Sequence, residues 1–184
     1  MRVAELRRLA ISGGLVAAAF AVKYALIGIP NVEPLTLAFF AVGFAYGAIW
    51  GAFVGIVGEG MFAAINPMGA PIAPVWVAQI IGMALAGMIG GLAGVAIRGR
   101  GEGRRWQIVA LVGAGVLATL IFDLLTNVAM AWSIGPFWPV MAAAIPFAGI
   151  HVLSNALLFA LIFPILQRWL IRYTSAAPPQ TLPS

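Results

Sequence analysis

The chain has no cysteine, a single histidine and very little charge. Of its 184 residues, 63% are hydrophobic and only 8% are charged, against about 25% charged in soluble domains. Without cysteine there can be no disulfide, no thiolate catalysis and no iron–sulfur site, and one histidine argues against a structural metal site. A soluble fold of this length could not bury so much apolar surface, so the composition indicates a protein embedded in lipid.

The sequence signatures of common enzymes are also missing. There is no His-Glu-x-x-His, no Gly-x-Ser-x-Gly and no phosphate-binding glycine loop. We therefore expect no enzyme activity and no bound cofactor. Because no segment resembles a nucleotide-binding site, any energy source would have to be an ion gradient or a partner protein.

Long apolar runs fill nearly the whole chain. Since a membrane span needs about 20 apolar residues, we predict an all-α integral membrane protein. It is a single six-transmembrane-helix bundle over residues 1–173, followed by a disordered, proline-rich tail at 174–184. The predicted spans are 9–29, 35–48, 52–65, 74–97, 106–132 and 140–169, the last of them interrupted by Pro146.

The basic residues predict the orientation of this bundle. Nine of the ten lie in three clusters, at residues 2–8, 98–105 and 168–172. Positive residues beside membrane spans stay in the cytoplasm, so both termini are predicted to be cytoplasmic and the location to be the cell membrane. The net charge of +5 then reflects topology and contact with anionic lipid, and we expect no nucleic-acid partner.

Small residues recur at every fourth position in two predicted spans. The stripes are Gly13, Ala17, Ala21 and Ala25 in the first span, and Gly82, Ala86, Gly90 and Gly94 in the fourth. Small side chains at this spacing form a flat surface that another helix can approach closely. For the fourth span we favour packing within the chain, whereas the first stripe could equally face a partner subunit.

Polar side chains are rare inside the predicted spans, and most fall at a similar depth in the outer half of the membrane. They are Lys23, Glu59, Gln79, Asp123, Thr126, Asn127, His151, Ser154 and Asn155. Asp123 and Asn127 are four apart, as are His151 and Asn155, so each pair shares a helix face. Because polar groups are costly in hydrocarbon, they usually face a bundle interior or a wet cavity.

We therefore predict a ligand pocket that opens to the outside. Its predicted lining is Glu33, Glu59, Gln79, Asp123, Asn127, His151, Asn155 and Trp132. If all are ionised, the acids Glu33, Glu59 and Asp123 together with Lys23 give the predicted pocket a formal charge of about −2. This charge favours a cationic or hydrogen-bond-rich ligand over a free carboxylate. Two interpretations of Lys23 stay open, namely snorkelling to the outer interface and a salt bridge to Glu59 or Asp123. The tryptophans suit either an interfacial belt or stacking on a flat ring.

Several short motifs resemble the substrate-binding S component of energy-coupling factor (ECF) vitamin transporters. They are six spans in under 200 residues, a basic loop between spans four and five, Ala17-x-x-x-Ala21, Pro30-Asn31-Val32-Glu33-Pro34 before span two, and Gly58-Glu59 followed by Asn66-Pro67-Met68-Gly69. Pro146 within the sixth span is a departure from that pattern.

The resemblance implies partners and a mechanism. The stripe of Ala17, Ala21 and Ala25 would contact a transmembrane coupling subunit, which is driven by two ATPase subunits. A vitamin or vitamin precursor would bind in an outward pocket of spans four to six, which holds Gln79, Asp123, Asn127, His151 and Asn155. The loop of residues 31–33 would act as its lid.

Three other functions remain open. The first is a gradient-driven small-solute carrier in which Glu59 and Asp123 exchange protons. The second is an intramembrane enzyme that uses Asp123 and His151 for acid–base chemistry, although no nucleophile accompanies them. The third is a purely structural membrane subunit, which would not need the polar set.

Overall fold

The computed structural model describes residues 2–98 and 104–174, and within them it contains seven α-helices and no strand. The helices are α1 (Val3–Ala25), α2 (Pro34–Tyr46), α3 (Ala48–Ala64), α4 (Ala73–Arg98), α5 (Arg104–Ile134), α6 (Phe137–Leu161) and α7 (Phe163–Thr174). The all-helical prediction is confirmed. The predicted tail lies outside the described residues except for Thr174, which ends α7.

Four of the helices are long and apolar enough to cross a membrane, namely α1, α4, α5 and α6. The helices α2 and α3 are apolar but have only 13 and 17 residues. At 1.5 Å per residue they extend about 20 and 25 Å, short of a hydrocarbon core of about 30 Å. The chain is therefore membrane-embedded, and the six-span count stays a prediction.

The predicted interruption of the sixth span at Pro146 is wrong. Pro146 lies within the continuous helix α6, and the break comes at Ile162 instead. Pro164 has no N–H to donate to the carbonyl of Ala160 and its ring would clash there, whereas it is tolerated in the first turn of a new helix. The chain therefore restarts as α7, a short amphipathic helix that buries Phe163 and Leu170.

The centre of the bundle is α2, in which every residue from Pro34 to Phe44 is buried. Its aromatic side chains pack edge-to-face against those of α6 and α7. Phe40 lies 4.8 Å from Phe159 and 5.2 Å from Phe163, measured between ring centroids. This geometry is favoured by the ring quadrupoles, and it holds α7 against the buried helix α2.

The glycines of α4 let α2 and α3 approach its backbone directly. A Cβ atom on Gly90 would meet the backbone carbonyl of Phe40, and one on Gly87 would meet that of Gly51. Such close helix contacts require residues without a side chain at the crossing. The interpretation of the fourth-span stripe as packing within the chain is confirmed.

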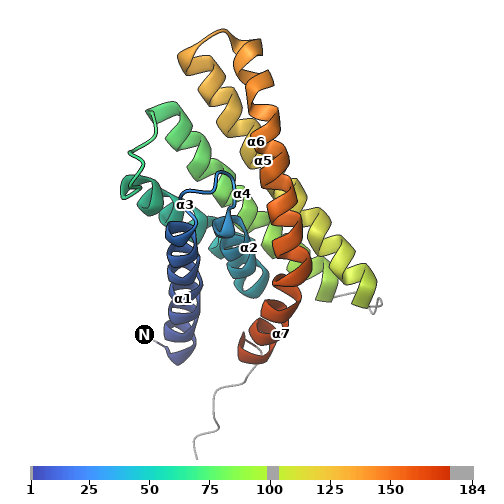
Figure 1. Cartoon of the computed structure of the whole chain (residues 1–184). Coiled ribbons are helices and arrows are strands. Elements are labelled where there is room, and N and C mark those ends of the chain that lie inside the picture. The colour runs from blue at the N-terminus through green and yellow to red at the C-terminus, as the bar shows by residue number, and fades with distance from the viewer. Residues whose placement is uncertain (1, 99–103, 175–184) are drawn as a thin grey trace, which may run out of the picture.

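The helix ends that carry the basic clusters lie at one end of the bundle (Figure 1). These are the start of α1, the end of α4, the start of α5 and the end of α7. The end of α1 and the start of α2 lie toward the opposite end, where the polar site is built. The arrangement is what the positive-inside rule requires, and the cytoplasmic location of the basic end stays a prediction.

Candidate functional site

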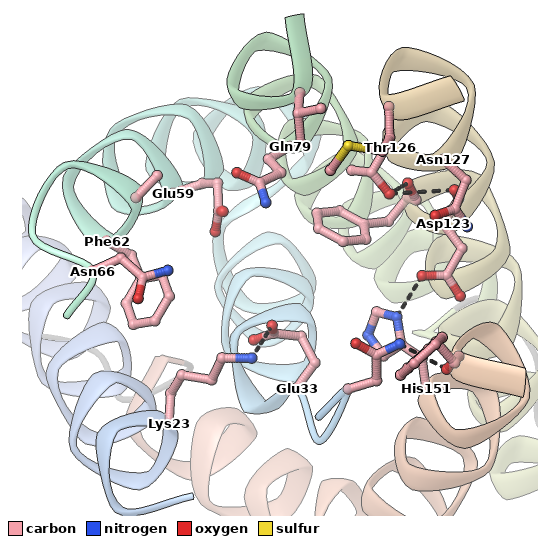
Figure 2. Close-up of a pocket in the computed structure, with 16 residues that line it drawn as sticks. Lys23, Glu33, Glu59, Phe62, Asn66, Gln79, Asp123, Thr126, Asn127 and His151 are labelled. Atoms are coloured by element: carbon pink, nitrogen blue, oxygen red, sulfur yellow. Dashed lines mark hydrogen bonds and ion pairs between the residues drawn. The ribbon is translucent and has the colours of Figure 1, made fainter. Parts of the chain in front are cut away.

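A cavity of about 320 Å³ opens between the helices, away from the basic end of the bundle. This volume lies within the range of small-molecule sites, about 300–1,000 Å³. Side chains from α1, α3, α4, α5 and α6 and from the two loops before α2 and α4 converge on it (Figure 2). Its lining comprises Lys23, Asn31, Glu33, Glu59, Phe62, Ala63, Asn66, Val75, Gln79, Phe122, Asp123, Thr126, Asn127, Met130, Phe147 and His151.

Six of the eight predicted pocket residues line this cavity. They are Glu33, Glu59, Gln79, Asp123, Asn127 and His151. Asn155 is fully buried and does not line the cavity, and neither the oxygen nor the nitrogen of its amide has a hydrogen-bond partner. Trp132 lies outside and is 84% exposed, because five residues beyond Asn127 the helix has turned about 140° away from the cavity face.

Lys23 lines the cavity, and its partner is Glu33. Its ammonium nitrogen lies 2.6 Å from Oε2 of that carboxylate. Glu33 is also the N-cap of α2, since its Oε1 accepts a hydrogen bond of 3.1 Å from the N–H of Leu35. Both oxygens of Glu33 are therefore occupied, and its charge is balanced locally. Neither Glu59 nor Asp123 is the salt-bridge partner of Lys23.

The loop between α1 and α2 is attached to α6. Asn31 has a φ of 58°, a left-handed conformation that asparagine tolerates better than most residues. Its side-chain amide donates to the carbonyl of Phe147 at 2.7 Å, and its own carbonyl accepts from the Ser154 hydroxyl at 2.9 Å. These bonds fix the loop, and with it Glu33, at the wall of the cavity.

His151 and Asp123 form a buried pair across α5 and α6. Nδ1 of the imidazole lies 2.7 Å from Oδ1 of the carboxylate, and the two rings of Phe122 and His151 pack edge-to-face at 5.7 Å. An ionised carboxylate only accepts hydrogen bonds, so it fixes the proton on Nδ1. In the neutral ring Nε2 is then an acceptor.

Four polar atoms in the cavity lining are buried without a hydrogen-bond partner. They are Oε2 of Glu59, Oε1 of Gln79, Oδ2 of Asp123 and Nε2 of His151. Glu59 and Gln79 face the cavity from one side, and Asp123 and His151 from the other (Figure 2). Buried polar atoms normally have partners, so this set indicates a ligand or water that donates hydrogen bonds from between the two sides.

Aromatic rings complete the cavity, and they were not among the predicted pocket residues. Phe62, Phe122 and Phe147 line it in place of the predicted tryptophan. The sequence could have indicated Phe147, because this residue is four positions before His151 and therefore shares its helix face. Apolar rings beside hydrogen-bond acceptors form a surface on which a flat, polar-edged molecule can bind.

Comparisons of the chain with known protein families, with curated proteins and with solved structures find no match. Over residues 2–98 and 104–174, no group of three His, Cys, Asp or Glu side chains is placed to hold a metal ion. The cavity lining can bind a ligand through hydrogen bonds, charge and aromatic contact.

The small residues of α1 face outward. Ala17, Ala21 and Ala25 are all exposed, and a Cβ atom on Gly13 would meet nothing within 4 Å. Ala17 borders an apolar groove between α1 and α3. Unlike the glycines of α4, this stripe is not used for packing among the described residues.

Proposed function

We propose that the chain is the substrate-capture subunit of an ECF-type importer for a vitamin or vitamin precursor. It binds the solute in the cavity from the outside and delivers it together with a transmembrane coupling subunit and two ATPase subunits. The observation that carries this proposal is the cavity itself, with unpartnered polar atoms on two facing sides. A structural subunit has no need of such a site, since unpartnered buried polar groups are destabilising.

The lining favours a cationic nitrogen heteroaromatic, such as thiamine or its pyrimidine precursor. Because Lys23 and Glu33 balance each other, the acidic side chains that remain in the cavity are Glu59 and Asp123. Both carboxyl groups can accept hydrogen bonds, as can Nε2 of His151 when the single ring proton is on Nδ1. Amine and protonated ring nitrogens supply the matching donors, and the phenylalanine rings suit the faces of a flat molecule.

The test is to purify the chain in mild detergent and to identify co-purifying small molecules by mass spectrometry. We expect one molecule of a cationic heteroaromatic per chain. An empty preparation whose melting temperature is unchanged by a panel of vitamins and their precursors would contradict the proposal. A tightly bound anionic solute would contradict the ligand class but not the capture role.

The exposed stripe on α1 supports a partner subunit at that surface, and it gives a separate prediction. Ala17→Leu or Ala21→Leu should abolish uptake by the assembled importer, because the larger side chain holds the facing helix away. Solute affinity of the isolated chain should stay within about twofold, since neither residue lines the cavity. Uptake into liposomes and calorimetric titration measure the two quantities.

The matched control for this prediction is Ala110→Leu, an exposed alanine on α5, away from the helix that carries the stripe, that does not line the cavity. It should leave uptake unchanged. Equal losses of binding and uptake in the Ala17 and Ala21 variants would contradict the coupling role of the stripe.

A gradient-driven carrier is the second candidate, and Glu59 favours it. This carboxyl is only 4% exposed and one of its oxygens has no partner, as expected for an intramembrane proton site. The carrier predicts flux of the co-purifying solute through the chain alone in liposomes, driven by a pH difference. The importer predicts no concentrative flux without the coupling and ATPase subunits.

A further inference from the structure

A second cavity lies at the basic end of the bundle. It has a volume of about 290 Å³ and lies where the start of α1, the end of α2 and the end of α7 meet. Its lining is Val3, Ala4, Glu5, Arg7, Arg8, Tyr46 and Thr174. Arg8 and Lys23 are 15 residues apart on α1, about 23 Å along the helix, so this cavity is separate from the polar site described above.

Arg8 is held in place by stacking. Its guanidinium lies 4.0 Å above the centre of the Trp50 ring on α3, and the indole N–H donates to the Ser12 hydroxyl of α1 at 3.0 Å. A guanidinium that stacks through its face keeps its edge N–H groups available for a planar or tetrahedral anion. The stack therefore orients a cation at this cavity and lowers the entropy lost when an anion binds.

Two further atoms here lack partners. The hydroxyl of Tyr46 and Nε of Arg8 are buried, and neither makes a hydrogen bond. Both can donate to an oxyanion. The one acid in the lining is Glu5, and one of its oxygens, Oε2, accepts a hydrogen bond from the backbone N–H of Arg2 at 3.0 Å. The unsatisfied groups of this cavity thus match an acceptor with several oxygens.

We propose that this cavity binds a phosphate group, supplied by the headgroup of an anionic phospholipid. The lipid source is favoured by the neighbouring surface of α1, where Val3, Leu6 and Leu9 are 65%, 52% and 45% exposed. Apolar side chains next to arginines at the end of a membrane helix suit acyl chains beside a charged headgroup. A bound lipid would join α1 to α2 and α7 at a point where the chain itself leaves a gap.

Native mass spectrometry of the full chain in mild detergent tests this proposal. Phosphatidylglycerol and phosphatidylcholine with identical acyl chains are titrated in parallel. One phosphatidylglycerol should bind at least about tenfold more tightly than phosphatidylcholine. Arg8→Gln should weaken phosphatidylglycerol binding about fivefold, the effect of one arginine near an anionic lipid. Tyr46→Phe should weaken it about threefold while conserving the shape of the side chain.

The matched control is Arg105→Gln, an exposed arginine at the start of α5 and the same end of the bundle that does not line the cavity. It should leave binding unchanged. Glycerol phosphate, a soluble headgroup fragment, distinguishes a lipid phosphate from the phosphate of a soluble compound. Competition with the lipid supports the lipid phosphate, and binding of glycerol phosphate in preference to the lipid supports a soluble phosphate compound. Equal binding of both lipids, equal losses from Arg8→Gln and Arg105→Gln, or no loss from Arg8→Gln and Tyr46→Phe would overturn the proposal.

Discussion

A chain carrying Asp123→Asn is expected to bind its solute about 10 to 100 times more weakly than the unaltered chain. The change replaces one of the two carboxyl groups of the cavity that have an unpartnered oxygen. A hydrogen bond to a charged group contributes about 1.5–3 kcal/mol, and 1.4 kcal/mol is a factor of ten in affinity. The amide oxygen can still accept from Nδ1 of His151, so the α5–α6 contact should remain. Isothermal titration calorimetry of the co-purifying solute measures the effect.

The control for Asp123→Asn is Trp132→Phe. Trp132 is on the same helix but lies outside the cavity, so its replacement should change affinity by less than about twofold. If the Asp123→Asn chain and the unaltered chain had equal affinities for the solute and the same melting temperature, the assignment of Asp123 as a ligand-binding residue would be contradicted.

The second large effect concerns folding. Gly90→Ala is expected to destabilise the bundle by about 1–3 kcal/mol, the usual range for an overpacked core. The added Cβ atom would meet the backbone of Phe40, which, unlike a flexible side chain, cannot move aside without displacing α2. For a chain of this length the melting temperature should fall by roughly 2–12 °C. A fluorescence-monitored thermal ramp in detergent measures it.

Gly13→Ala provides the matched control. Gly13 is also within a helix, but nothing lies within 4 Å of where its Cβ atom would be placed. Since alanine is the better helix former by about 1 kcal/mol, this change should leave the melting temperature unchanged or raise it slightly. Similar decreases for both variants would show that glycine is not needed at the α4 crossing.

The helical fold could be predicted because apolar runs and arginine clusters are local signals. The helix starts and ends agree with the predicted spans within a few residues at most boundaries, with α1 beginning earlier than predicted. The break at Ile162 was missed because both Pro146 and Pro164 disrupt a helical hydrogen bond. Only the packing of Phe163 and Leu170 against the bundle decides which proline ends the helix.

The site was predictable to the extent that depth along a helix can be read from the sequence. Residues four apart share a face, so Asp123, Asn127 and His151 converge as expected. The salt-bridge partner of Lys23 could not be predicted, because Lys23 meets Glu33 through the turn of the loop that follows α1, and only the fold defines that turn. The phenylalanine lining was missed since an apolar ring within a span gives no polar signal.

The burial of α2 bears on how the protein is made. A helix of 13 residues is too short to span the bilayer by itself, and its successor α3 follows after the single residue Gly47, whose φ is 97°. Neither helix is suited to leave the translocon alone, so the pair should enter the lipid as one hairpin. The helices α1 and α3 cover part of α2, whereas the residues of α4, α6 and α7 that complete its burial are synthesised later. The core of this protein is therefore complete only after α7 has been made.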